Sequence, residues 1–423
     1  MAAAVCAQDA GHAVTVWEAA RTWGGRARAL DLQLPGGQTV RLDNGQHILI
    51  GAYRDCLGLM RRVGLDPAQL LLRLPLELRF PDGSGIGFPN WPAPFDALAG
   101  ILGARGWHWA DKLALARAAT RWRLAQFRCP ADWSVTRLCQ GLTPRVMADL
   151  VEPLCVSALN TLAADSSARV FLRVMQDAVF GERQGSNLLL PRADLSALFP
   201  DAAARWLAQQ GAQLHQGTRV RQLAYDGRHW RVDGAPFERV ILATAAHDAV
   251  HVLQASLAHV DAPTASAMRR WIDMTANLPH AAIGTVYAWA QGVALARPML
   301  ALRSGPTADA LMPAQFVFDR GQLGGPRGLL AFVVSASEGD RGTLQSQVLV
   351  QARRQLGLQL QSVGTVIEKR ATLTCTPGLL RPPMAIAPGL LACGDYVDGP
   401  YPSTLEGAVR SALAVTRSPA SGT

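Results

Sequence analysis

The N-terminal stretch contains a helix, a turn, a strand and an acidic residue in that order. This order constrains the fold more than any other feature of the chain. Met1–Ala10 predicts a helix that stops at Gly11, and Ala13–Trp17 predicts a buried strand that Glu18 closes. These elements form one unit of a parallel α/β sheet that binds a dinucleotide. The strand and the glycine-rich loop that open such a unit would lie ahead of Met1.

Two glycines and an arginine follow the acid at a spacing that suits a nucleotide. An acid at this strand end accepts hydrogen bonds from ribose hydroxyls, although exposed strand ends also often carry an acid. Gly24 and Gly25 let the backbone approach a pyrophosphate and Arg26 can neutralise it, the alternative being an ordinary Gly-Gly turn. Glu18 and the GGR triplet together favour a nucleotide.

Further elements of the nucleotide type lie in the middle and at the end of the chain. Residues 194–244 predict a helix over 197–211, a strand over 217–223, a hairpin turn at Asp226–Gly227 and a buried strand over 239–243. Near the C-terminus a strand, GLLACGDY, runs into a Gly-Asp turn, and EGAVRSALAV predicts a helix.

The intervening stretches differ from these segments, which predicts two domains. Residues near 55–187 are helix-rich, and residues near 250–375 mix helices with apolar strands such as GTVYAWA and GLLAFVVSAS. We expect a nucleotide domain formed by residues 1–54, 188–250 and 376–423, and a substrate domain formed by residues 55–187 and 251–375.

Composition describes a globular chain. Hydrophobic residues make up 49% and charged residues 17% of the 423 positions, which excludes a disordered protein. The mean hydropathy of +0.10 points to a large apolar cavity or to contact with a membrane. The net charge of +9 comes from arginines that are scattered singly along the chain, so no nucleic-acid partner is expected. The arginine excess reflects either a GC-rich genome or attraction to anionic lipid.

The sequence also predicts a reducing, cytoplasmic location. None of the seven cysteines forms a CxxC pair, and Met1–Ala10 carries Asp9 without the basic start of a signal peptide. The longest uncharged run is Met274–Ala296, and its centre, Ile283–Trp289, alternates like a strand, so no transmembrane helix is expected and contact with the plasma membrane would be peripheral. His247 and His251 stand four residues apart without a third ligand, and no metal site is expected.

The acid and glycine motif, E-x-x-x-x-x-GGR, resembles that of the FAD-binding amine oxidase and phytoene desaturase superfamily. The resemblance implies an α/β fold, in which a Rossmann-like FAD-binding domain of the GR2 type is built from discontinuous segments beside an α+β substrate domain. It also implies that the backbone near Val220 contacts adenine. Gly394 and Asp395 would then meet the ribityl and pyrophosphate groups.

The C-terminal motif GDYVDGPYPSTLEGAVRSA extends this resemblance. Glu406, Gly407 and Ala408 would present a helix N-terminus to the flavin. Ser403 and Glu406 also match a capping box, S-x-x-E, and the two interpretations are compatible.

A narrower resemblance covers nearly the whole chain. The blocks DNGQHILIGAY, EPLCVSALNT, SSARVFLRVMQDAVFG, SNLLLPRADLSALFP, FVFDRGQLGG and EKRATLTCTPGLLRP resemble the hydroxysqualene dehydroxylase family, also described as squalene-associated FAD-dependent desaturases. The resemblance implies FAD as cofactor, hydroxysqualene as substrate and squalene, ahead of hopanoid synthesis, as product. It also implies a strand and a G-x-G-x-x-G loop ahead of Met1, absent here through a late start assignment or a truncation.

The resemblance leaves the catalytic acid unknown. Reduced flavin would supply the electron pair, and an acid would protonate the departing hydroxyl. His47 is one candidate for the acid, but Gly45, Gln46 and His47 would equally contact the flavin. The tryptophans between residues 91 and 133 either line a terpene pocket or pack in the interior.

Three alternatives to dehydroxylation stay open from the sequence. A desaturase or isomerase of a carotenoid-like polyene would share the fold and FAD. An amine oxidase is disfavoured because the C-terminal segment lacks the aromatic pair that frames an amine. A non-catalytic carrier of apolar lipid could use the same cavity.

Overall fold

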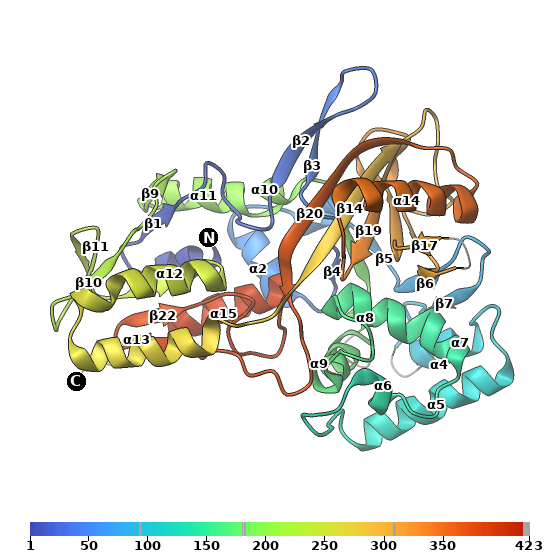
Figure 1. Cartoon of the computed structure of the whole chain (residues 1–423), viewed down its shortest axis with the longest axis horizontal. Coiled ribbons are helices and arrows are strands. Elements are labelled where there is room, and N and C mark those ends of the chain that lie inside the picture. The colour runs from blue at the N-terminus through green and yellow to red at the C-terminus, as the bar shows by residue number, and fades with distance from the viewer. Residues whose placement is uncertain (93–94, 180, 182, 308–309, 418–423) are drawn as a thin grey trace.

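Two small parallel pairings organise one half of the molecule. The computed structural model describes residues 1–92, 95–179, 181, 183–307 and 310–417. Strand β1 (Thr15–Glu18) pairs in parallel with β9 (Gln213–Gln216), and β13 (Val240–Leu242) pairs in parallel with β22 (Leu390–Ala392). In Figure 1 these strands lie in the left half, among helices from both ends and the middle of the chain. The fold is α/β, as predicted.

The helices around these strands come from distant parts of the sequence. Helix α1 contacts both α15 and α11, and α12 contacts α13. Their bounds are α1 (Ala2–Asp9), α2 (Arg54–Arg62), α11 (Pro200–Gln209), α12 (Ala246–Ser256), α13 (Ala262–Thr275) and α15 (Leu405–Arg417). The strands expected over 239–243 and in GLLACGDY and the helix expected in EGAVRSALAV are confirmed. The two-domain division at the stated boundaries stays a prediction.

The helix-turn-strand unit at the N-terminus forms as expected, with one difference. Helix α1 ends at Asp9, and Gly11 takes a φ of +83°, a conformation that favours glycine. Strand β1 follows, but its four residues are half-buried rather than buried. The reason is that β1 pairs with β9 along one edge, while its other edge faces a cavity.

The middle segment departs from two expectations. The helix expected over 197–211 is interrupted: α10 (Leu195–Leu198) ends at Phe199, whose φ is −157°, and Pro200 begins α11. The strand expected over 217–223 lies mostly outside any helix or strand, and β10 comprises only Leu223–Tyr225.

The hairpin turn at Asp226–Gly227 is confirmed. Tyr225 of β10 faces Trp230 of β11 (Trp230–Val232), and the hairpin continues into β12 (Ala235–Phe237). One carboxylate oxygen of Asp226 accepts hydrogen bonds from the backbone amides of Arg228 and His229, which holds the turn.

A five-stranded antiparallel sheet forms the centre of the other half. Its order is β15 (Met299–Ala301), β18 (Phe316–Asp319), β19 (Leu329–Ser335), β14 (His280–Trp289) and β20 (Gln361–Leu373). Helix α14 (Arg341–Leu356) covers one face with Leu344, Val348 and Ala352, and the other face joins the main core. The strands expected in GTVYAWA and GLLAFVVSAS are β14 and β19.

Further short strands and helices complete the molecule, and α4 to α9 lie at the lower right of Figure 1. The strands are β2 (Ala29–Gln33), β3 (Thr39–Asp43), β4 (Leu49–Ile50), β5 (Leu71–Leu74), β6 (Glu77–Arg79), β7 (Gly85–Gly87), β8 (Leu188–Pro191), β16 (Gly305–Pro306), β17 (Leu311–Met312) and, beside β22, β21 (Ala385–Ala387). The helices are α3 (Pro67–Leu70), α4 (Phe95–Leu102), α5 (Trp109–Leu124), α6 (Val135–Leu138), α7 (Pro144–Val146), α8 (Glu152–Leu159) and α9 (Ala168–Val174).

Candidate functional site

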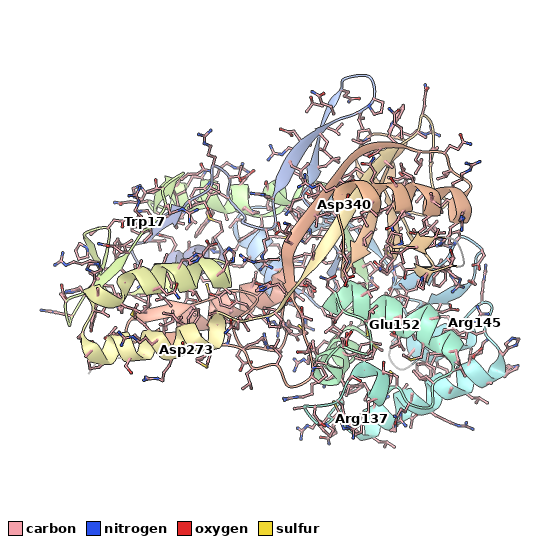
Figure 2. The ribbon with its side chains drawn as sticks, in the orientation of Figure 1. Trp17, Arg137, Arg145, Glu152, Asp273 and Asp340 are labelled. Atoms are coloured by element: carbon pink, nitrogen blue, oxygen red, sulfur yellow. The ribbon has the colours of Figure 1, made fainter. Side chains whose placement is uncertain are left out.

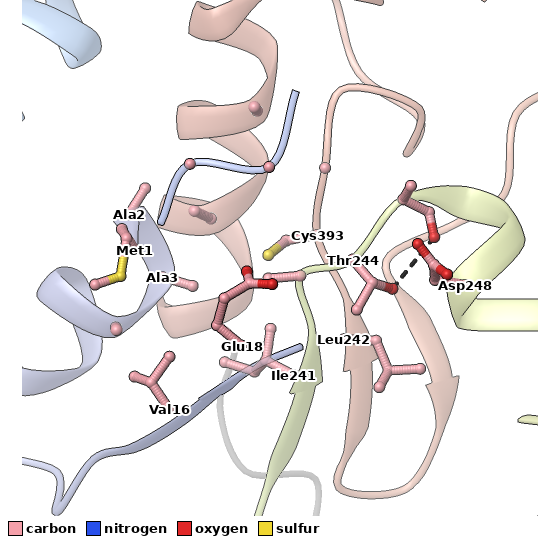
Figure 3. A pocket seen from close by; sticks show the side chains of 18 of the residues that line it. Met1, Ala2, Ala3, Val16, Glu18, Ile241, Leu242, Thr244, Asp248 and Cys393 are labelled. Atoms are coloured by element: carbon pink, nitrogen blue, oxygen red, sulfur yellow. Dashed lines mark hydrogen bonds between the residues drawn. The ribbon is translucent and has the colours of Figure 1, made fainter. Parts of the chain in front are cut away.

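A cavity of about 1790 Å³ separates the two parallel pairings. Strand β1 with the preceding Val14 forms one wall, and β13 with residues 243 and 244 after it forms the facing wall. The start of α1 borders the space between them (Figure 3). Within the described residues, β1 pairs only with β9, and β13 pairs only with β22. The cavity exceeds the usual pocket for a small ligand, roughly 300–1,000 Å³.

Glu18 lies at the mouth of this space. Figure 3 shows its side chain between α1 and β13. One carboxylate oxygen accepts a hydrogen bond of 2.7 Å from the amide of Ala20, which fixes the side chain at the strand end. The second carboxylate oxygen can accept a hydrogen bond from a hydroxyl of a ligand in the cavity.

The glycine turn after Glu18 lines the same cavity. Gly24 and Gly25 both take positive φ values, +104° and +59°. A Cβ added to Gly24 would lie 2.4 Å from the carbonyl oxygen of Ala27, so no larger residue fits this turn. The turn therefore brings bare backbone to the cavity wall.

Arg26 pairs with a carboxylate instead of facing the cavity alone. Its guanidinium lies 2.5 Å from Asp395 and donates to the carbonyl of Ala371 at 2.5 Å. Asp395 follows β22, and Ala371 belongs to β20, so the contact joins the glycine turn to two distant segments. The sequence indicated the positions of Arg26 and Asp395 but not their pairing.

The N-terminus of α15 borders the cavity through Ala408, but its acid has another role. The Glu406 side chain is 1% exposed and accepts hydrogen bonds from the amides of Asp55 and Cys56, at 3.3 and 3.0 Å. These amides open α2, so Glu406 holds α2 to α15 and does not line the cavity among the described residues. That the N-terminus of α15 faces the flavin stays a prediction.

The capping box expected between Ser403 and Glu406 does not form. The hydroxyl of Thr404, not that of Ser403, accepts the amide of Gly407 at 2.9 Å. Ser403 instead accepts the amide of Leu373 at 2.7 Å. Gly407 does not line the described cavity, but a Cβ there would lie 1.9 Å from the carbonyl of Tyr401, which explains the glycine.

The NGQH block reaches the cavity through His47 alone, as far as the described residues go. Gly45 lies behind it and accepts from His47 Nδ1 at 2.8 Å, while Gln46 accepts from Arg320 at 3.0 Å. Burial lowers the pKa of His47, so the ring is neutral at pH 7. With Nδ1 donating to Gly45, Nε2 is left as an acceptor, which does not suit the acid role.

The block is held by Asp43, a buried carboxylate at the end of β3. Asp43 is 1% exposed and accepts the amide of Leu195 at 2.7 Å, while Tyr287 donates to its backbone carbonyl at 2.8 Å. Burial raises the pKa of Asp43 to about 6. Sequence reasoning missed this residue because nothing in the DNGQH letters distinguishes a buried acid from an exposed one.

The remaining expected residues fall into two groups. Val220 and Gly394 line the cavity, and a Cβ at Gly394 would lie 2.7 Å from the Tyr396 ring. Among the tryptophans of residues 91–133, Trp107 and Trp122 are buried in the core, and none of the five borders the cavity as the structure describes it. The terpene-pocket interpretation of these tryptophans therefore finds no support here.

Three cavity residues escaped the sequence analysis: His280, Tyr396 and Lys369. His280 Nδ1 lies 2.8 Å from the carbonyl of Leu278, and burial lowers the pKa of the ring. The Tyr396 hydroxyl is buried without a hydrogen-bond partner in the described part of the chain. Lys369 and Tyr396 stand inside quoted sequence blocks that assign them no role, and the fold brings these residues together from β14, β20 and the turn after β22.

The cavity fits FAD. The acid at the strand end suits a ribose, the bare glycine turn suits a pyrophosphate, and the first amides of α1 line the same space without an acid in their turn. Arg219 and Arg221 add positive charge to the wall. Among the described residues, no helix has the length and apolar character that a membrane span requires. In the same part of the chain, no group of three or more His, Cys, Asp or Glu side chains could bind a metal ion.

Two known proteins resemble the chain, one of them over nearly its whole length. Hydroxysqualene dehydroxylase of Zymomonas mobilis is 25% identical over 446 aligned positions, which cover 97% of this chain and 94% of that protein. A protein of the same name from Sinorhizobium fredii is 26% identical over 227 residues, 53% of this chain and 52% of its own.

A solved structure supports the fold. The crystal structure of an oxidoreductase from Methanosarcina mazei matches with a TM-score of 0.72 at 16% identity, covering 99% of this chain and 97% of that one. Residues 1–417 match the family of flavin containing amine oxidoreductases. The chain belongs to this family and is an FAD-dependent oxidoreductase.

Proposed function

We propose that this enzyme removes the hydroxyl group of hydroxysqualene and releases squalene. The observation that carries the proposal is the similarity to the Zymomonas mobilis hydroxysqualene dehydroxylase, which extends over 97% of the chain and therefore includes both halves of the molecule. The high mean hydropathy of +0.10 agrees with a long apolar substrate.

The reaction exchanges one bond at carbon for another. The C–O bond breaks, a C–H bond forms, and the hydroxyl leaves as water, at the cost of two electrons and two protons. The two-electron-reduced form of FAD would supply the electron pair when bound, and an external reductant would restore that form after each turnover. Glu18, the turn at Gly24 and Gly25, and the Arg26–Asp395 pair would hold the cofactor at the cavity wall.

The chain's own residues would govern water and protons near the reacting carbon. Loss of water from the protonated allylic alcohol creates a cation that water would capture again, so apolar walls such as Leu373 and Val409 would protect it. His47 and His280 are neutral rings whose Nδ1 atoms face carbonyls, so each offers Nε2 as an acceptor. An acceptor there would hold water or the departing hydroxyl in place.

Product analysis tests the proposal. The FAD-loaded protein is incubated with hydroxysqualene and a reductant, and separately with a carotenoid-like polyene under oxidising conditions. Squalene from the first mixture supports dehydroxylation. New double bonds in the polyene, with hydroxysqualene untouched, would instead support a desaturase, and binding of both without turnover would support a carrier.

A further inference from the structure

Large apolar side chains gather on the surface of two helices. Phe95, Leu98 and Leu102 of α4 are 60, 52 and 49% exposed, and Trp109 and Leu113 of α5 are 68 and 50% exposed. Other exposed large apolar residues of the described chain, such as Leu162, Leu311 and Leu380, stand singly. Single exposed apolar residues are ordinary, whereas a contiguous group marks a surface that contacts something apolar.

Helix α4 carries apolar residues on two opposite faces. Ala97, Gly100 and Ile101 are buried against the protein. Phe95, Leu98 and Leu102 follow the spacing i, i+3, i+7 and form a second stripe toward solvent. A helix needs one apolar face to pack on its own protein, so the second face is available for a partner.

Helix α5 continues this surface. The Lys112 ammonium donates to the carbonyl of Leu102 at 2.6 Å and lies 5.4 Å from the centre of the Trp109 ring. These contacts place the first turns of α5 beside the end of α4. We call the surface formed by Phe95, Leu98, Leu102, Trp109 and Leu113 the α4–α5 face.

The surroundings of the α4–α5 face are basic. Arg105, Arg117 and Arg123 are exposed on or beside the two helices. Residues 95–124 carry five basic side chains against two acids, Asp96 and Asp111, and Asp111 is buried and accepts from the Thr143 hydroxyl at 2.5 Å and the His108 amide at 2.8 Å. Figure 2 shows two further arginines, Arg137 and Arg145, at the same end of the molecule.

We propose that the α4–α5 face docks on the surface of a bilayer that contains anionic phospholipid. Tryptophan, leucine and phenylalanine insert at the boundary between headgroups and acyl chains, and arginine and lysine attract the anionic headgroups. A second copy of the chain would bring like charges together, so charge complementarity favours lipid over self-association. The inference does not depend on which substrate the enzyme uses.

Vesicle flotation of the FAD-loaded protein tests the inference. Vesicles of phosphatidylcholine alone are compared with vesicles in which phosphatidylglycerol replaces part of it. We expect binding to the anionic vesicles, weakened by salt. The double variant Leu98→Glu/Trp109→Glu should lose at least tenfold in partition, and Arg117→Glu/Arg123→Glu should lose the preference for phosphatidylglycerol.

The control is Leu380→Glu, since Leu380 is 86% exposed and lies outside the α4–α5 face. It should bind vesicles like the unmodified protein, and equal flavin content in all variants shows that they are folded. Equal partition of the Leu98→Glu/Trp109→Glu variant and the unmodified protein would overturn the proposal. So would a concentration-dependent dimer that this variant abolishes, in a protein that ignores vesicles.

Discussion

The guanidinium of Arg26 lies 2.5 Å from the carboxylate of Asp395, and this contact joins residues 369 positions apart. It ties the glycine turn after β1 to the turn after β22, and both turns line the cavity. If the pair positions the two turns for FAD, the two residues act as a unit, and the losses of FAD binding free energy caused by substituting each residue do not add.

A double-mutant cycle tests this coupling. We expect Arg26→Gln and Asp395→Asn each to weaken FAD binding about tenfold, because each removes charge-assisted hydrogen bonds. The double variant should lose clearly less than the product of the two losses. The measurement is the Kd of FAD by flavin fluorescence, with Arg28→Gln as the control on the same cavity wall. Strictly multiplicative losses would show that the pair is incidental.

Glu18→Gln keeps the shape of the side chain and removes its charge. We expect the Kd of FAD to rise at least about tenfold, since a hydrogen bond to a charged group contributes about 1.5–3 kcal/mol. Calorimetric titration with FAD measures the change, and Glu338→Gln, on an exposed acid outside the cavity, is the control. An unchanged Kd would leave Glu18 as an ordinary acid at a strand end.

Asp43→Asn should alter the pH dependence of stability. The pKa of Asp43 is about 6 in the folded protein and 3.8 without burial, so folding retains a proton that the unfolded chain releases. The contribution of Asp43 is therefore full below about pH 4 and is lost as the pH rises to about 6, a change of about 3 kcal/mol.

The Asn variant keeps the acceptor for the Leu195 amide and carries no buried charge. Its thermal midpoint should exceed that of the unmodified protein at pH 8, and the two should converge toward pH 4. Asp31→Asn, on an exposed acid of β2, serves as the control. Parallel midpoints from pH 4 to pH 8 would contradict the buried charge.

Glu406→Ala should destabilise the fold without a specific effect on FAD. The change leaves the amides of Asp55 and Cys56 without their acceptor, which costs about 2–4 kcal/mol, while the Arg410 guanidinium keeps the Asp55 carboxylate at 3.0 Å. Glu406→Gln keeps one acceptor oxygen and should lose less. Thermal unfolding measures both, and the Kd of FAD is measured where both variants are folded. A Glu406→Ala variant with weaker FAD binding and an unchanged thermal midpoint would instead support a contact between Glu406 and the flavin.

The sequence predicts the elements of this fold where local signals are strong. Gly11 stops α1 because a positive φ favours glycine, and Asp226–Gly227 makes a hairpin because its carboxylate holds the turn. The helix expected over 197–211 forms over Pro200–Gln209 as α11, and its start at Pro200 agrees with the preference of proline for the first helical position, which the apolar pattern alone does not reveal.

The site was predictable to the extent that its chemistry is local. Glu18, Gly24, Gly25 and Arg26 come together in one turn and could be placed by spacing alone. Glu406 could not, because a helix N-terminus presents its acid in several directions and packing against α2 decides among them. Cavity residues such as His280, Tyr396 and Lys369 meet only through the tertiary fold, and no periodicity indicates them.

The mass of the product made in D₂O tests the proposed function most directly. The protein, both as printed and with an apolar strand and G-x-G-x-x-G loop added ahead of Met1, is given FAD, hydroxysqualene and a reductant. We predict squalene one mass unit heavier than the natural compound, because the hydrogen that replaces the hydroxyl comes from a group that exchanges with solvent. Hydroxysqualene left intact by both FAD-loaded forms, while a polyene gains double bonds, would contradict the account.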